Sequence, residues 1–453
     1  MEKLNPQVFR EYDIRGIVDK DLTEEFAEEL GKAYGTHIMK NGLSRVTVAR
    51  DGRLSSERLK SALVQGMIST GCQVTDIGLC PTPVFYFSIF HLNKEGGVMV
   101  TGSHNPPDFN GFKICVGKET LYGKQIQNLR KIMEDGAYLS DKGNADSYEI
   151  LPYYRDHLLK NLHIKRGLKV VLDAGNGTAG IIAPQLFKDF HCECIELYCE
   201  VDGTFPNHHP DPTVMENIRD LIANVKEEKA DMGIAYDGDA DRIGVIDEQG
   251  NVLWGDQLLI IFSREILKVH KGATIIGEVK CSQILYDEIS KFGGKPIMWK
   301  AGHSLIKHKM KEEGALLAGE MSGHIFFSDR YYGYDDAIYA SLRLAEILSA
   351  TDKRLSEFLQ DIPKTFSTPE IRVDCPDDIK FKVVKKAKEY FKAKYKTVDV
   401  DGVRILFDDG WGLIRASNTQ PALVLRFEAF SQEGLMEIKT LVEGKLKGVL
   451  ESF

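Results

Sequence analysis

The sequence predicts an α/β protein with three consecutive α/β domains, each built on a mixed, mostly parallel sheet, and a smaller C-terminal α+β domain, all around a central cleft. Two observations support this prediction. A short apolar stretch, a polar turn containing glycine and an amphipathic stretch follow one another repeatedly, and such alternation is typical of largely parallel sheets. The pattern also restarts twice and then changes its order in the last part of the 453 residues.

In the first unit a short irregular stretch at 9–16 precedes a helix. Phe26, Leu30, Tyr34 and Ile38 recur every fourth residue, which predicts an amphipathic helix with acidic residues in its first turn. Apolar stretches at 46–49, around 74 and at 97–100 predict strands, with helices beginning near 56 and 84.

The two restarts share the same form. At 169–177 and again at 273–277 an apolar strand ends in a glycine-containing turn. We predict helices at 179–187, 282–292, 305–313 and 342–348, and further strands at 232–236, 243–246 and 315–318. After the polar segments at 351–354 and 366–369, a strand at 370–373, a long helix containing 379–391, several strands and a closing helix predict the α+β domain.

The length and the restarts set the domain boundaries. A chain of 453 residues is too long for one ordinary hydrophobic core. We predict domains over residues 1–150, 151–252, 253–366 and 367–453.

Composition excludes some partners and locations. Lys+Arg total 58 against 67 for Asp+Glu, a net charge of -9, so we expect no binding to nucleic acid or to anionic membranes. The start has no basic segment followed by an apolar one, and no stretch approaches the roughly 20 apolar residues of a membrane span. We therefore expect a cytoplasmic protein. The eight scattered cysteines indicate reduced thiols.

A serine loop follows the strand at 97–100. Thr101–Pro107 contains Ser103 between a glycine, which allows close approach to the hydroxyl, and a rigid double proline. We interpret Ser103 as a phosphoryl carrier, presented at the loop surface and not buried. The alternative is an ordinary turn, because Gly, Ser, Asn and Pro are common turn residues.

A loop with three carboxylates lies between the strands at 232–236 and 243–246. Asp237, Asp239 and Asp241 occupy alternate positions and can converge on one hard divalent cation such as magnesium. An EF-hand calcium loop is disfavoured, because Arg242 stands where that loop needs glycine and because the flanking elements are strands. The same residues also fit a solvated acidic turn.

Two further loops carry groups suited to a sugar phosphate. Glu320 and Ser322 lie in a glycine-rich turn and can face a polyhydroxylated ligand, although such a turn is common in other roles. The last domain offers an arginine, hydroxyls and an amide that can surround a phosphate, or that simply form a capped turn. These residues are Arg415, Ser417, Asn418, Thr419 and the nearby Arg426.

Each of these loops follows an apolar strand in a different predicted domain. Ligands of open α/β sheets bind at the carboxyl ends of strands, so the four loops are expected to line one cleft for a ligand with an anionic group at each end. Basic residues beside the glycine turns favour anion binding. They are Arg15, Lys113, Lys118, Arg242, Lys280, His303 and Lys307.

These motifs resemble the α-D-phosphohexomutase family, and within it the phosphomannomutase/phosphoglucomutase branch. The resemblance spans nearly the whole chain, in order. The matching segments are 9–16, 50–53, 101–107, 110–113, 173–177, 237–242, 302–304, 319–324 and 415–421. It implies a four-domain, heart-shaped fold.

The resemblance also implies roles for single residues. Ser103 is expected to be the phosphoserine and, with Asp237, Asp239 and Asp241, to bind Mg²⁺. Glu320 and Ser322 are expected to contact sugar hydroxyls. Arg415, Ser417, Asn418 and Thr419 are expected to hold the phosphate that is not transferred. Other expected active-site residues are Tyr12, Arg15, Lys113, Lys280, Arg242, His303 and His324.

The implied reaction is a reversible 1,6 phosphoryl shift on mannose or glucose phosphates, which makes the protein an isomerase and a phosphoprotein of carbohydrate metabolism. The expected cofactor is Mg²⁺, with a hexose 1,6-bisphosphate as intermediate and activator, in a monomer or weak dimer. Met321 favours this branch over phosphoglucosamine mutase, where Gln is more usual. The loops are also compatible with a phosphatase that hydrolyses the phosphoserine and with a non-catalytic sugar-phosphate sensor, but the presence of all four together disfavours both.

Overall fold

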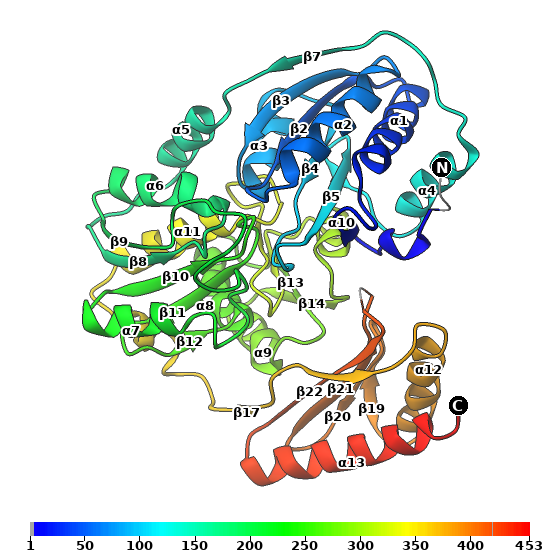
Figure 1. Ribbon diagram of the computed structural model, residues 1–453. Helices are drawn as coiled ribbons and strands as arrows, with labels where there is room; N and C mark the ends of the chain where they lie inside the picture. The colour runs from blue at the N-terminus through cyan, green and yellow to red at the C-terminus, as the bar shows by residue number, and fades with distance from the viewer. Residues whose placement is uncertain (1–3, 419) are drawn as a thin grey trace.

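The computed structural model describes residues 4–418 and 420–453 and contains four sheets, each with its own helices (Figure 1). In Figure 1 the three α/β units lie together and the fourth unit lies below them, joined through the segment of β17. The predicted succession of three α/β domains and a smaller α+β domain is confirmed. Within the described residues, no helix is both long and apolar enough to cross a membrane.

The first sheet has the order β1-β5-β4-β2-β3-β7, with β6 on β5. Its centre is parallel, and β5 runs antiparallel to both β1 and β4. Thr23 caps α1, accepting a hydrogen bond from the N–H of Phe26 at 3.1 Å. The strands are β1 (Ile14–Ile17), β2 (Arg45–Arg50), β3 (Gln73–Leu79), β4 (Gly96–Val100), β5 (Phe109–Val116), β6 (Glu119–Thr120) and β7 (Asn144–Ser147). The helices are η1 (Pro6–Val8), α1 (Glu24–Lys40), α2 (Ser56–Ile68), α3 (Thr82–His91) and α4 (Lys124–Asp135).

The second sheet has the order β12-β11-β10-β8-β9, parallel at β10-β8-β9 and antiparallel beyond β10. The helix predicted at 179–187 is wrong as one element, because Pro184 lacks an N–H and a 3₁₀ turn precedes a new helix there. The strands are β8 (Lys169–Asp173), β9 (Glu193–Leu197), β10 (Met232–Tyr236), β11 (Ile243–Asp247) and β12 (Val252–Leu253). The helices are α5 (Leu151–Asn161), η2 (Thr178–Ile181), α6 (Ala183–Asp189) and α7 (Arg219–Glu227).

The third sheet has the order β14-β13-β15-β16, in which only β16 is antiparallel to its neighbour. The strands are β13 (Thr274–Glu278), β14 (Lys295–Trp299), β15 (Leu317–Gly319) and β16 (Ile325–Phe327). The helices are α8 (Gly255–Val269), α9 (Gln283–Lys291), α10 (His303–Glu313), α11 (Ala337–Ser349) and η3 (Leu355–Leu359).

The fourth sheet is antiparallel, with the order β17-β22-β21-β20-β19 and β18 beside β22. The strands are β17 (Phe366–Ser367), β18 (Ile371–Asp374), β19 (Lys396–Val398), β20 (Val403–Leu406), β21 (Gly410–Ala416) and β22 (Ala422–Ala429). The helices are α12 (Lys380–Lys392) and α13 (Gln432–Leu450).

The hydrophobic cores show how the units join. One continuous core holds Phe85, Tyr154 and Phe262, so the three α/β units pack against one another. The fourth unit has its own core between its sheet and its two helices. On its other face Trp411 and Leu413 pack on Val279 of the third unit. The apolar contact between the fourth unit and the third is therefore small, and buried polar contacts extend it, such as those from Arg404 to the carbonyls of Val279 and Cys281.

Candidate active site

Ser103 lies at the carboxyl end of β4 with a left-handed backbone, φ 48°. Its hydroxyl donates to Asp237 Oδ2 at 2.8 Å and lies 3.2 Å from His104 Nδ1. Its N–H donates to Thr101 Oγ1 at 2.9 Å. The expectation that Ser103 is presented and not buried was wrong, since only 2% of the residue is exposed. The second domain covers it through Asp237.

Arg53 fixes the backbone of the serine loop. Its guanidinium donates to the carbonyls of Ser103 at 2.7 Å, Asn105 at 2.5 Å, Pro106 at 2.5 Å and Phe109 at 3.0 Å. A Cβ at Gly102 would lie 2.4 Å from Arg53 Nε. The loop thus needs glycine at this position because the arginine lies against its backbone.

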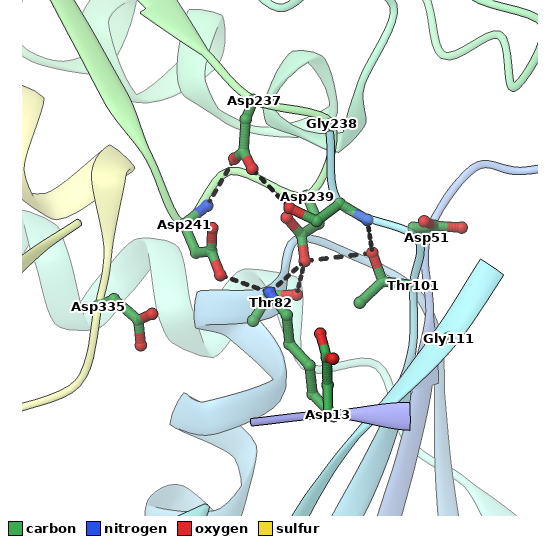
Figure 2. A network of polar contacts seen from close by, with 12 residues as sticks. Asp13, Asp51, Thr82, Thr101, Gly111, Asp237, Gly238, Asp239, Asp241 and Asp335 are labelled. Atoms are coloured by element: carbon green, nitrogen blue, oxygen red, sulfur yellow. Dashed lines mark hydrogen bonds and ion pairs between the residues drawn. The ribbon is translucent and has the colours of Figure 1, made fainter. Parts of the chain in front are cut away.

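The three predicted aspartates converge (Figure 2). One carboxylate oxygen from each of Asp237, Asp239 and Asp241 lies within 4.8 Å of the others. All three side chains are buried. Lys113 forms ion pairs with Asp239 at 2.6 Å and with Asp241. Burial and the neighbouring carboxylates raise the pKa of Asp237 well above its usual range. One ammonium group therefore faces three clustered carboxylates.

This cluster fits a hard divalent cation. Two buried oxygens, Oδ1 of Asp239 and Oδ1 of Asp241, have no hydrogen-bond partner in the part of the chain that the structure describes. Carboxylate oxygens on a rigid loop are the ligands that such ions prefer. Thr82 and Thr101 donate to Asp239 Oδ2 at 2.6 and 3.1 Å, which orients that side chain.

The two predicted histidines form a pair. The rings of His303 and His324 are stacked with centroids 5.5 Å apart. Arg242 Nε donates to His324 Nε2 at 2.9 Å, so this nitrogen is the acceptor and Nδ1 carries the proton. His324 Nδ1 lies 3.1 Å from the carboxylate of Asp335 and 3.6 Å from Asp241. Burial and the Lys307 ammonium hold the pKa of His303 well below its usual range.

Tyr12 joins three of the domains. Its hydroxyl donates to the carbonyl of Ala301 at 2.8 Å and accepts from Asn418 at 2.5 Å. Its ring packs edge-on against His303, with centroids 5.9 Å apart. Glu320 accepts from the N–H of Gly302 at 2.7 Å in the same region. The first, third and fourth domains therefore meet around this tyrosine.

The basic residues near the fourth domain are held by acidic partners. Lys280 pairs with Glu370 at 3.1 Å, and Glu278 lies 3.6 Å away. Arg415 pairs with Asp401 at 2.9 Å. The positive charges of Lys280 and Arg415 thus lie near the junction of the third and fourth domains and are partly neutralised by these carboxylates.

Of the remaining predicted residues, Arg15 and Arg426 contact groups described above. Arg15 bonds to Asn105 of the serine loop at 2.6 Å and to Asp13 at 2.5 Å. Arg426 donates to the carbonyl of Lys280. Ser322 is half-buried in the turn between β15 and β16.

The remaining part of the predicted phosphate site is in the turn after β21. Ser417 accepts from the N–H of Gln420 at 3.1 Å, which closes the turn. Thr419, also predicted for this site, lies outside the described residues.

Two residues that organise the site are not predicted by sequence reasoning. Arg53 belongs to one of the matching segments, but nothing around it indicates a donor to four carbonyls. Asp335 contacts His324, lies 3.7 Å from His303 and accepts from Lys307 at 2.9 Å. The sequence signal that points to Asp335 is the pair of adjacent aspartates before α11. An apolar helix needs only one capping residue, so the second aspartate is available for another role.

The comparisons with known proteins agree along the whole chain. Family models described as phosphoglucomutase/phosphomannomutase alpha/beta/alpha domains I, II and III match residues 6–139, 152–250 and 254–366. The model of the C-terminal domain of the same family matches residues 370–445.

Individual relatives also match over nearly the whole chain. The chain is 49% identical to a phosphomannomutase/phosphoglucomutase of Pseudomonas aeruginosa, over 98% of this chain and 96% of the relative. It is 44% identical to a phosphoglucomutase of Neisseria gonorrhoeae, over 100% of this chain and 98% of the relative. A solved structure of a phosphoglucomutase/phosphomannomutase family protein from Burkholderia thailandensis matches with a TM-score of 0.94 at 41% identity, covering 99% and 98% of the two chains. The chain therefore belongs to the phosphoglucomutase/phosphomannomutase family.

Proposed function

We propose that this protein is an isomerase that catalyses reversible 1,6 phosphoryl transfer on mannose and glucose phosphates, with Ser103 as the phosphoryl carrier. The observation that carries the proposal is the 2.8 Å hydrogen bond between the Ser103 hydroxyl and Asp237, within a cluster of three buried carboxylates. A serine whose hydroxyl points at a divalent-cation site is suited to carry a phosphoryl group. The relatives named as phosphomannomutase/phosphoglucomutase support the same reaction.

The reaction has two transfers that mirror each other. In the first, the bond between the Ser103 oxygen and phosphorus breaks, and phosphorus bonds to the free hydroxyl oxygen of the hexose phosphate, whose proton passes to a protein base. The resulting hexose 1,6-bisphosphate turns end over end. In the second transfer its other phosphate returns to Ser103, and the sugar oxygen regains a proton.

Lys113 or His324 moves this proton. Lys113 reaches the aspartate loop directly, whereas His324 is held by Arg242 on one side and by Asp335 on the other. A positioned group of this kind contributes about 10²- to 10⁴-fold to the rate. Arg15, bonded to Asn105 in the serine loop, offsets charge on the transferred group.

The aspartate loop would hold Mg²⁺. Asp237, Asp239 and Asp241, together with an oxygen at Ser103, are the proposed ligands. When bound, the ion would neutralise charge that develops on the phosphoryl oxygens during transfer. The buried oxygens without partners and the raised pKa of Asp237 support a cation at this place.

The substrate would lie between the aspartate loop and the fourth domain. We assign the sugar hydroxyls to Glu320 and Ser322 and the distal phosphate to the fourth-domain residues with Lys280, Tyr12 and His303 beside them. The fourth-domain residues are Arg415, Ser417, Asn418, Thr419 and Arg426.

Further parts of the proposal concern the protein's state in the cell. We propose that a hexose 1,6-bisphosphate primes Ser103, that the protein is a monomer or weak dimer, and that it is cytoplasmic. The four domains are proposed to span 1–150, 151–252, 253–366 and 367–453.

The test uses Ser103→Ala with mannose 1-phosphate and glucose 1-phosphate as substrates. We expect turnover to fall at least about 10³-fold while binding of the hexose phosphate by calorimetry persists. Ser88→Ala is the matched control, because Ser88 is buried in the same domain and its hydroxyl donates to Thr47 and Phe85 of that domain. Parental turnover in Ser103→Ala would contradict the proposal. Steady release of inorganic phosphate from the parent would instead identify a phosphatase.

A further inference from the structure

A cavity of about 390 Å³ lies between the first and third domains. Its lining shares no residue with the serine loop, the three aspartates or the two histidines. One wall comes from α3 and the segment around β6, and the other from α10 and the segment between β16 and α11. Its volume lies within the roughly 300–1,000 Å³ typical of small-molecule sites.

Aromatic rings form much of the lining. The rings of Phe90 and Tyr332 lie 4.5 Å apart, and those of Tyr86 and Tyr334 lie 5.4 Å apart. Each pair joins the first domain to the third. A flat aromatic group is therefore the apolar ligand that these walls favour.

The lining also carries positive charge. Lys311 forms an ion pair with Glu119, and Lys307 pairs with Asp335 at 2.9 Å. Lys118 is exposed and lies 4.8 Å above the ring of Phe90, and it makes no ion pair with any described residue. One ammonium group at the cavity is thus left to attract an anion.

Two buried hydroxyls provide a second and independent indication of a ligand. Ser304 is 1% exposed and Thr120 is 8% exposed, and both line the cavity. Neither hydroxyl has a hydrogen-bond partner among residues 4–418 and 420–453. Buried hydroxyls normally have partners, so these two are suited to bind a polar group of a ligand.

We propose that this cavity is a second binding site, and that it takes a small aromatic monoanion. The rings of the lining contact the aromatic group, Lys118 pairs with the anionic group, and Ser304 and Thr120 bond to its polar atoms. The proposal does not depend on the reaction proposed above, since no residue of that site takes part.

The experiment is calorimetric titration of the full-length protein with 2-naphthoate and with its neutral isostere 2-naphthamide. We expect one 2-naphthoate per chain, with binding unchanged in saturating glucose 1-phosphate. Lys118→Gln should weaken 2-naphthoate about threefold to fivefold, as for an exposed ion pair, and leave 2-naphthamide unchanged. Lys445→Gln is the matched control, because Lys445 lies 5.4 Å above the ring of Tyr390 in the fourth domain. It should change neither titration.

A second variant tests the aromatic wall. Tyr332 is 38% exposed, so Tyr332→Ala should fold, and it should weaken both probes. The proposal is overturned if 2-naphthoate does not bind or is displaced by glucose 1-phosphate. It is equally overturned if Lys445→Gln weakens 2-naphthoate as much as Lys118→Gln does, or if Tyr332→Ala changes neither probe.

Discussion

The hydroxyl of Ser103 in the first domain donates to Asp237 in the second at 2.8 Å, so one hydrogen bond joins the proposed phosphoryl carrier to the proposed metal loop. The ionised form of Asp237 is at the same time destabilised by its surroundings, because burial and two neighbouring carboxylates raise the pKa of its carboxyl group. Removing the charge of Asp237 should therefore lower activity without lowering the stability of the metal-free protein.

We expect Asp237→Asn to lower turnover about 10²- to 10³-fold and to leave the melting temperature of the metal-free protein unchanged or higher. Mg²⁺ at about 100 times its Kd should stabilise the parent by about 2.7 kcal/mol and the variant by much less. Scanning calorimetry in EDTA and in Mg²⁺ measures both. Equal stabilisation of the two proteins by Mg²⁺ would place the ion elsewhere.

Arg53→Lys is expected to loosen the serine loop. A lysine cannot reach four carbonyls in a fixed planar fork, so buried acceptors lose their donors, at a cost of about 2–4 kcal/mol of unfolding free energy. Arg58→Lys is the control, because Arg58 makes half-exposed ion pairs with Asp19 and Glu24. It should cost less than about 1 kcal/mol. Equal losses in chemical denaturation would show that the carbonyl contacts do not matter.

The sequence was sufficient for features that depend on local pattern. The fourfold spacing of apolar residues predicted α1, and the alternating aspartates predicted the carboxylate cluster. It was insufficient for α8, in which 258–262 form an unbroken apolar run that has no helical period. Such a run fits a buried strand as well as a helix, so periodicity alone does not identify the element.

Within the site, the residues that sequence reasoning missed act over long separations. Arg53 binds carbonyls about 50 positions away, and Asp335 connects His303, Lys307 and His324 on two other segments. Nothing in the sequence around Asp335 distinguishes it from Asp336, which caps α11 and accepts hydrogen bonds from two tyrosines. Only the folded structure shows that Asp336 caps the helix and that Asp335 lies beside His324.

Asp335→Asn tests the orientation of His324. The carboxylate lies 3.1 Å from Nδ1 of His324, and an amide at this place would remove the negative charge that favours the tautomer with its proton on Nδ1. We expect kcat to fall about 10- to 100-fold with little change in KM. Asp336→Asn is the matched control, since Asp336 accepts from Tyr154 at 2.9 Å, from Tyr331 at 2.8 Å and from the N–H of Tyr339, and it should affect stability more than kcat. An unchanged kcat in Asp335→Asn would favour Lys113 as the group that moves the proton.

Tyr12→Phe should weaken substrate binding more than catalysis. The change removes the hydroxyl that connects Ala301 in the third domain with Asn418 in the fourth. We expect KM to rise about threefold to tenfold, which corresponds to the net value of one or two hydrogen bonds. Tyr138→Phe, which loses a 3.4 Å bond to Met133 within the first domain, should leave KM unchanged. A fall in kcat with constant KM would contradict this role.

Glu370→Gln tests how the fourth domain is attached to the third. The Lys280 ammonium, 3.1 Å away, lowers the pKa of Glu370 to about 2 from 4.5, although burial opposes the shift. A carboxyl with a lowered pKa in the folded state contributes stability that is complete above the unfolded value and is lost as the pH falls towards 2. The parent should therefore be more stable than Glu370→Gln by about 1–3 kcal/mol at pH 7, and the difference should shrink between pH 4.5 and pH 2. Melting curves at several pH values measure this difference in stability.

Glu389→Gln is the control, because Glu389 lies exposed on α12 without an ion pair among the described residues. The stability difference between this variant and the parent should be small and independent of pH. A difference for Glu370→Gln that is independent of pH over this window would mean that the Lys280 pair does not stabilise the attachment of the fourth domain.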